Sequence, residues 1–132
     1  VIGIAAGMLD GLGLSSLKGA LMSRGTREIA RLIKALGGNE LSAYGLCHLG
    51  DYEATVFSPY SHNRAFGERF VRGERYAQLA EGMATAKALR VLSTRCGVGL
   101  PICGAVYDVL YEGVNPREAL SNLFLRSLKR EF

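Results

Sequence analysis

Hydrophobic residues recur along the chain at helical spacing, and the alternation expected of strands is almost absent. The first apolar stretch covers Val1 to Leu14. A long amphipathic helix is predicted next, capped by Ser15 or Ser16 and stopped by the glycines that follow Leu36. We expect its charged residues to occupy the faces away from the apolar stripe: Arg24, Arg27, Glu28, Arg31 and Lys34.

The rest of the chain predicts further helices, separated by glycine and proline signals. Asn115, Pro116 and Glu118 form a strong start signal for the last one, as cap, first helical residue and third. In chain order we expect a short helix around Glu40 to Leu46, a loop-like passage from Cys47 to Asn63, and helices over Asn63 to Gly73, Ala77 to Cys96, Pro101 to Gly113 and Asn115 to Arg130. The pattern predicts one all-α domain, residues 1–132, of five to seven helices without an internal repeat or linker.

Three glycines of the first stretch fall at intervals of four residues, at Gly3, Gly7 and Gly11. On a helix this spacing lines one face with glycine and lets another backbone approach closely. A membrane-dimer interpretation is disfavoured, because the stretch is short and carries Asp10. We therefore expect close packing inside a helical domain.

Composition and charge narrow the classes of partner. The chain has 132 residues, 48% of them hydrophobic, which is enough for one domain with its own core. No stretch is long and apolar enough for a membrane span, and no secretion signal opens the chain. Of 16 cationic residues 12 are arginines, which bind phosphate and carboxylate well, but they are scattered among acids without a nucleic-acid motif. Neither a membrane nor a nucleic acid is expected as a partner.

Cysteine and glycine motifs offer no metal or cofactor site of their own. Cys47, Cys96 and Cys103 form neither a CxxC pair nor a zinc-ligand pattern, so we expect reduced thiols in a cytoplasmic protein and no metal. The segment Gly11 to Ser16 misses the last glycine of a dinucleotide fingerprint and follows no predicted strand.

The segment from Gly45 to Gly67 concentrates polar residues, and two interpretations stay open for it. It is either a solvated connection or a site for anions and hydroxyl groups. In a site, Arg64 would supply charge, Ser61 and Asn63 would donate hydrogen bonds, and Asp51 would accept them. His62, beside Asn63 and Arg64, is the more interesting of the two histidines, whereas His48 is expected to be a surface or satisfied residue.

A series of short stretches, in this order and at this spacing, carries a resemblance to a known family: Val1 to Gly7, Asp10 to Gly13, Lys18 to Gly25, Gly45 to Asp51, Ser61 to Arg64, Ala80 to Gly82, Leu100 to Ile102 and Ala105 to Gly113. From Val1 to about Leu128 the chain resembles the C-terminal, substrate-binding domain of NAD(P)-dependent sn-glycerol-3-phosphate dehydrogenases. The resemblance implies an all-α, multi-helix domain of the 6-phosphogluconate dehydrogenase C-terminal type. In that family it follows a Rossmann domain that binds NAD or NADP, and the active site lies in the cleft between the two.

The resemblance also implies an activity and the residues that serve it. The reaction is reversible hydride transfer between sn-glycerol 3-phosphate and dihydroxyacetone phosphate, which feeds glycerophospholipid synthesis. The catalytic lysine of the family stands in a Lys-Asn pair immediately before the residue equivalent to Val1, and Asp51 and Thr55 would orient it. The implied substrate-binding residues are Asp51, Ser61, His62, Asn63 and Arg64, and the implied cofactor-binding residues are His62 and Glu81.

His62 is the main departure from the family, which carries an arginine at this position. Arginine offers a permanent charged fork to phosphate, whereas histidine titrates near neutral pH. Two alternatives therefore stay open: a paralogous dehydrogenase with a different hydroxy compound as substrate, and a non-catalytic helical interaction domain that uses the glycine face of Val1 to Leu14. We expect the chain to be the trimmed half of a two-domain enzyme, inactive alone, with its own Rossmann domain and a small phosphorylated polyol as partners, and a homodimer as an option.

Overall fold

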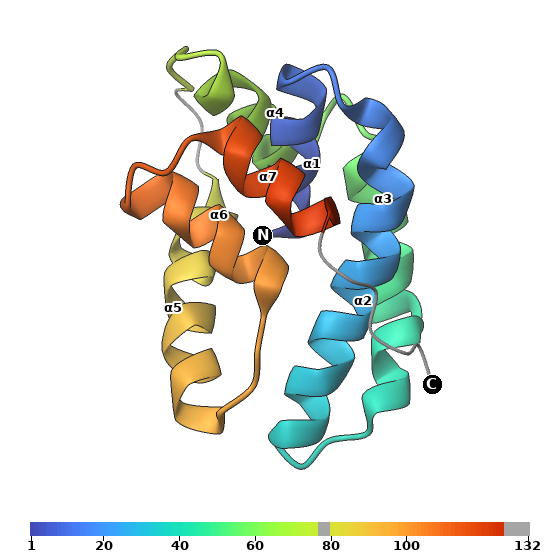
Figure 1. The fold of residues 1–132 in the computed structure, drawn as a ribbon. Coiled ribbons are helices and arrows are strands. Elements are labelled where there is room, and N and C mark those ends of the chain that lie inside the picture. The colour runs from blue at the N-terminus through green and yellow to red at the C-terminus, as the bar shows by residue number, and fades with distance from the viewer. Residues whose placement is uncertain (77–79, 126–132) are drawn as a thin grey trace.

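Seven α-helices and no strand make up residues 1–76 and 80–125, the part of the chain that the computed structural model describes (Figure 1). The helices are α1 (Ile2–Gly11), α2 (Lys18–Ala35), α3 (Asp51–Val56), α4 (His62–Val71), α5 (Glu81–Cys96), α6 (Pro101–Tyr111) and α7 (Pro116–Leu125). Three short turns complete them: the 3₁₀ turns η1 (Ser15–Leu17) and η2 (Glu40–Tyr44), and the π-helical turn η3 (Leu46–Gly50). The prediction of an all-α fold is confirmed.

Helix α1 is the centre of the core. Every residue from Ile2 to Leu9 is buried, because the helix has no polar face until Asp10. It lies among α2, α3, α4 and α6, so its first turn is deep inside the molecule (Figure 1). Val1, at this end, packs against both hydrophobic clusters of the core.

The glycine face of α1 is covered by α4. A Cβ added at Gly7 would overlap the carbonyl oxygen of Arg64 and lie 2.8 Å from the backbone nitrogen of Glu68. On the other helix, a Cβ at Gly67 would overlap the carbonyl oxygen of Ile4. The prediction of close packing is confirmed, and the alternative that this face is a surface for a partner is wrong, because the chain covers it itself.

The glycine and proline signals at helix ends are confirmed. Gly37, Gly97 and Gly113 all have positive φ, at 86°, 62° and 69°, which is the conformation that glycine adopts after a helix. At the start of α7, the Asn115 side chain accepts a hydrogen bond from the Glu118 backbone nitrogen at 3.1 Å. The predicted end of this helix at Lys129 and Arg130 lies outside the described residues, as do Ala77 to Leu79.

Three local predictions are wrong. Neither Ser15 nor Ser16 caps the long helix: both belong to η1, α2 is preceded by Leu17, and no side chain caps either element. The Ser15 hydroxyl donates to Asp10 instead.

The passage expected to be a loop from Cys47 onward forms η3 and α3, and only residues 57–61 are left to connect α3 with α4. Proline is absent until Pro59, and Asp51 and Glu53 stand in the first turn of α3, where the helix dipole favours negative charge. Helix formation therefore continues almost to that proline.

The third wrong prediction concerns Glu28, which the sequence pattern puts on a solvent face but which is 1% exposed. Its carboxylate accepts hydrogen bonds from the backbone nitrogens of Ile102, at 2.7 Å, and Cys103, at 3.1 Å. These nitrogens belong to the first turn of α6 and have no partner within that helix. Burial raises the pKa of Glu28, and the hydrogen bonds from Cys103 and Ile102 offset part of that effect. Glu28 thus joins α2 to α6 from inside the core.

The thiols in the described part of the chain agree with the prediction. Cys96 and Cys103 carry free thiols, as expected, while the expectation for Cys47 lies outside the described side chains. Burial and the neighbouring Glu28 raise the pKa of Cys103, so this thiol stays protonated. None of the described helices combines the length and the hydropathy needed to cross a membrane.

Candidate functional site

The predicted site residues come from three helices that meet at the first turn of α1. A Cβ built at Gly3 would lie 3.0 Å from Thr55 Cγ2, on α3, and 3.1 Å from Asn63 Cβ, on α4. Both side chains therefore touch the backbone of α1 at Gly3, two residues from Val1. The tight contact fixes their distance from each other, because a backbone has no rotamers with which to adjust.

The start of α5 closes the same site through Asn63. The Asn63 side-chain oxygen accepts a hydrogen bond from the Gly82 backbone nitrogen at 2.9 Å. A Cβ at Gly82 would lie 2.9 Å from that oxygen and 3.1 Å from the Val1 nitrogen, so only glycine brings α5 this close. Because the amide oxygen is occupied, Asn63 has its N–H donors left to offer, which suits an anionic oxygen.

Asp51 and Thr55 lie four residues apart on α3 and share a face of that helix. Asp51 is exposed and Thr55 is half-buried. The pair therefore extends from solvent toward the start of α1. Tyr52, between them in sequence, has its pKa raised to about 12 by burial and by the negative charge of nearby acidic groups. Its hydroxyl stays neutral at physiological pH.

Ser61 and His62 form the beginning of α4. The Ser61 hydroxyl accepts a hydrogen bond from the Arg64 backbone nitrogen at 3.2 Å and so caps the helix. The same hydroxyl keeps a proton that it can donate to a ligand. His62 is exposed, and its ring lies edge-on to that of Tyr76 with centroids 6.4 Å apart.

His62 and Glu81 are the residues that could face a cofactor. His62 precedes Asn63 and Glu81 precedes Gly82, and a hydrogen bond joins Asn63 to Gly82. Both the His62 and the Glu81 side chains are exposed. They are thus close to the substrate candidates and open to a molecule that arrives from outside. Within the described ranges, no three His, Cys, Asp or Glu side chains come together as metal ligands would.

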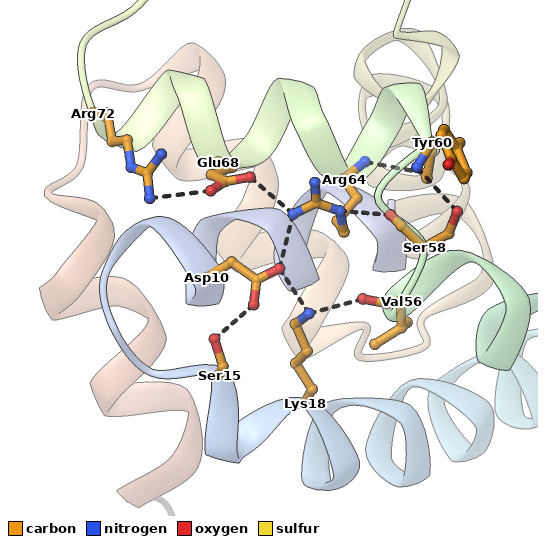
Figure 2. A network of polar contacts seen from close by, with 10 residues as sticks. Asp10, Ser15, Lys18, Val56, Ser58, Tyr60, Arg64, Glu68 and Arg72 are labelled. Atoms are coloured by element: carbon orange, nitrogen blue, oxygen red, sulfur yellow. Dashed lines mark hydrogen bonds and ion pairs between the residues drawn. The ribbon is translucent and has the colours of Figure 1, made fainter.

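Arg64 points elsewhere. Its Nη1 pairs with Asp10 Oδ2 at 3.0 Å and with Glu68 Oε2 at 2.8 Å, and its Nε donates to the Ser58 carbonyl oxygen at 2.7 Å (Figure 2). The guanidinium is therefore turned toward the C-terminal end of α1 and engaged by the protein, while Ser61 and Asn63 stay at the site.

Asp10 and Lys18 are the residues of this region to which the sequence assigned no role. The Asp10 carboxylate accepts hydrogen bonds from Ser15 at 2.6 Å and Lys18 at 2.7 Å, in addition to Arg64 (Figure 2). Partial burial alone would raise the pKa of Asp10, but the bonds from Lys18, Ser15 and Arg64 outweigh it, and the pKa lies below its ordinary value. A signal was present: Asp10 stands in the last turn of α1, where the helix dipole disfavours a carboxylate unless cations surround it.

Comparison with known proteins shows one family. The profile of the family described as NAD-dependent glycerol-3-phosphate dehydrogenase C-terminus matches residues 1–121. The chain is 42% identical to the glycerol-3-phosphate dehydrogenase [NAD(P)+] of Anaeromyxobacter sp. (strain K), with 99% of this chain covered. It is 44% identical to the enzyme of the same name from Thermus thermophilus, also over 99% of this chain. The chain spans 42% of the length of each relative.

A solved structure shows the same fold. The crystal structure of glycerol-3-phosphate dehydrogenase from Coxiella burnetii superimposes with a TM-score of 0.86 and 31% sequence identity. The match covers 95% of this chain and 41% of that one.

Proposed function

The chain belongs to the family of NAD-dependent glycerol-3-phosphate dehydrogenase C-terminal domains, and on that premise we propose that it is the substrate-binding part of such an enzyme. The reaction is the interconversion of sn-glycerol 3-phosphate and dihydroxyacetone phosphate with NAD or NADP. The observation that carries the proposal is the convergence of Thr55, Asn63 and Gly82 on the first turn of α1, from three different helices. It lies where the resemblance puts the reacting atoms, next to Val1.

The residues of the site divide between the two ends of the substrate. Asp51 and Thr55, on one face of α3, serve the carbonyl or hydroxyl end, where they orient the reacting oxygen and the lysine that the resemblance puts before Val1. Ser61 and Asn63 serve the phosphate end, because one keeps a hydroxyl proton and the other its amide N–H donors. Because both ends of the substrate are held, the entropy cost of aligning it for hydride transfer is met on binding.

A cofactor fits the exposed edge formed by His62 and Glu81. When bound, NAD or NADP supplies or accepts the hydride at the substrate carbon. The two side chains hold its near edge, and the main binding surface belongs to a Rossmann domain of the longer protein.

The test is kinetic and uses the full-length protein that contains this chain. We expect NADH or NADPH oxidation that depends on dihydroxyacetone phosphate, and no turnover by residues 1–132 alone. Asn63→Ala should raise the KM for dihydroxyacetone phosphate by roughly tenfold or more, the value of a hydrogen bond to a charged group. The matched control is Asn122→Ala, an exposed asparagine on α7, which should leave the KM unchanged. A full-length protein without this turnover, or equal effects of the two variants, contradicts the proposal.

His62 favours a second candidate, a paralogous dehydrogenase that acts on a different phosphorylated or carboxylated hydroxy compound. A histidine in place of arginine gives the anionic end of the substrate a weaker and pH-dependent charge. A panel of such compounds, offered to the full-length protein and to His62→Arg, separates the two. If the substituted protein gains activity on dihydroxyacetone phosphate while the native one prefers another compound, the second candidate holds.

A further inference from the structure

The connection between α3 and α4, residues 57–61, is not held by burial. Phe57 is 60% exposed and Tyr60 is 88% exposed. Its own hydrogen bonds are local, from the Ser58 nitrogen to the Thr55 carbonyl oxygen at 3.2 Å and from the Tyr60 nitrogen to the Ser58 hydroxyl at 3.1 Å. Yet this connection joins α3 to α4 and ends at Ser61, whose hydroxyl is a candidate donor to the phosphate.

Two cations, the buried Lys18 and the partly buried Arg64, hold the connection from the protein side. Lys18 Nζ donates to the Val56 carbonyl oxygen at 3.0 Å, and Arg64 Nε donates to the Ser58 carbonyl oxygen at 2.7 Å (Figure 2). Between these two anchor points, the Phe57 ring lies over the ammonium group, 5.3 Å from Nζ to the ring centroid. Hydrogen bonds from charged donors are about twice as strong as neutral ones, so both anchors are firm.

One carboxylate brings both cations to that place. Asp10 Oδ2 lies 2.7 Å from Lys18 Nζ and 3.0 Å from Arg64 Nη1, and Ser15 holds the other oxygen. The three charged side chains are only 9%, 13% and 14% exposed, so water screens the two cations poorly. Arg64 has a second carboxylate in Glu68, whereas the ion pair of Lys18 in the described part of the chain is with Asp10. The negative charge of Asp10 offsets the repulsion between Lys18 and Arg64, and without that charge the two cations would repel each other.

We propose that Asp10 is a positioning residue for the substrate site, and that it acts through the side chains of Lys18 and Arg64. The network locks residues 57–61 and so fixes the place of Ser61, at the phosphate end, relative to Thr55 and Asn63, which pack against the backbone of α1. Arg64, which the resemblance put on the phosphate, then works through the backbone of the connection. This inference rests on the proposed function and deepens it.

The experiment measures Asp10→Asn in the full-length protein. Asparagine keeps the shape and removes the charge, so the connection loosens while the hydride-transfer geometry around the first turn of α1 is kept by glycine contacts. The KM for dihydroxyacetone phosphate should rise by roughly tenfold or more, the loss expected for a charged hydrogen-bond network. The KM for NADH should stay the same, and so should kcat/KM for dihydroxyacetone, which has no phosphate to misplace.

A double variant separates positioning from stability. Asp10→Asn with Lys18→Met removes one charge of each sign and ends the repulsion, but it also removes the donor to the Val56 carbonyl oxygen. Thermal stability should therefore recover relative to Asp10→Asn while the KM for dihydroxyacetone phosphate stays high. If Asp10→Asn does not fold, the double variant carries the same KM comparison on its own.

The control is Asp108→Asn, which breaks an exposed ion pair with Arg90 between α5 and α6 and should change none of these constants. Equal increases in KM for the phosphate substrate and NADH, or an equal loss with dihydroxyacetone, would overturn the positioning role. The native full-length protein tests the proposed function separately, because a lack of turnover there is independent of any variant.

Discussion

The contact between α1 and α4 and the contact among α5, α6 and α7 are built in opposite ways. In the first, backbones touch through Gly7 and Gly67, and the charged side chains beside them are shielded and paired. In the second, the helices leave an open cavity of about 690 Å³ whose lining includes Arg90 and Asp108. That ion pair is long, at 3.6 Å, and its two side chains are 48% and 38% exposed.

The difference between the two contacts shows where the positions of side chains are tightly constrained in this domain. Asn63 belongs to the tight contact, and Thr55 of α3 packs against Gly3 of the same α1, so both are placed by a glycine backbone. Surface ion pairs such as that of Arg90 contribute little, and an open cavity leaves room for side chains to shift. Changes at the first contact should therefore damage both folding and the site, and changes at the second should do little.

The most damaging single change is expected at Gly7. Its substitution by alanine puts a methyl group onto the Arg64 carbonyl oxygen, and backbone atoms can yield only if α4 moves away from α1. We expect the free energy of unfolding to fall by about 3 kcal/mol or more, the upper range for overpacking. Chemical denaturation measures it. A loss below about 0.5 kcal/mol, the range of neutral surface changes, would mean that α4 is free to move and that the contact is not tight.

A smaller loss of stability but a sharper effect on the site is expected for Gly82→Ala. The added methyl group meets two side-chain atoms at 2.9 Å, Asn63 Oδ1 and Ile4 Cδ1, which can turn aside, and the Val1 backbone nitrogen at the longer distance of 3.1 Å. The cost to unfolding should be about 1–3 kcal/mol, while Asn63 loses its hydrogen bond to the start of α5.

In the full-length protein, Gly82→Ala should raise the KM for dihydroxyacetone phosphate more than the KM for NADH. Steady-state kinetics at a temperature where the variant is folded checks this. An unchanged KM for the phosphate substrate would show that Asn63 does not need α5 to hold its orientation.

Acid should lower the stability of the protein at the contact between α1 and α4, through Asp10. Its pKa is lowered in the folded protein, so in the acid range the unfolded chain binds more protons at this residue than the folded one. The stabilisation is present above the ordinary aspartate pKa and is lost as pH falls through the lowered value. Denaturation curves at a series of acid pH values should show that native protein loses stability more steeply than Asp10→Asn. Parallel slopes would mean that the network does not favour the charged carboxylate.

The sequence predicted what depends on local spacing. Helical periodicity gave the helices, and the interval between Gly3, Gly7 and Gly11 gave the face on which α4 packs. The resemblance supplied the site residues. Neither approach could show that Glu28 points inward, because its partners, the first nitrogens of α6, lie 74 and 75 residues away.

The same limit applies to Asp10 and Arg64, which are 54 residues apart. Both lie in stretches that match the family, but a match says that a position is shared and not which atoms it contacts. The direction of the Arg64 side chain follows from the approach of α4 to α1, a property of the folded backbone. The short α3 escapes sequence reasoning for a related reason: a helix of only six residues forms when the core supports it, and not from local propensity alone.

The smallest effect, and one of opposite sign, is expected for Gly104→Ala on α6. Gly104 is a glycine inside a helix like Gly7, but the nearest atom to an added Cβ is Arg90 Nη1 at 3.5 Å, the end of a flexible side chain beside the open cavity. Alanine then reduces the entropy of the unfolded chain without strain, and stability should rise by about 0.5–1 kcal/mol. Denaturation under the conditions used for Gly7→Ala gives the comparison directly. Since the two variants make the same chemical change, a loss at Gly104 as large as the loss at Gly7 would assign the cost to helical glycines in general and not to the contact between α1 and α4.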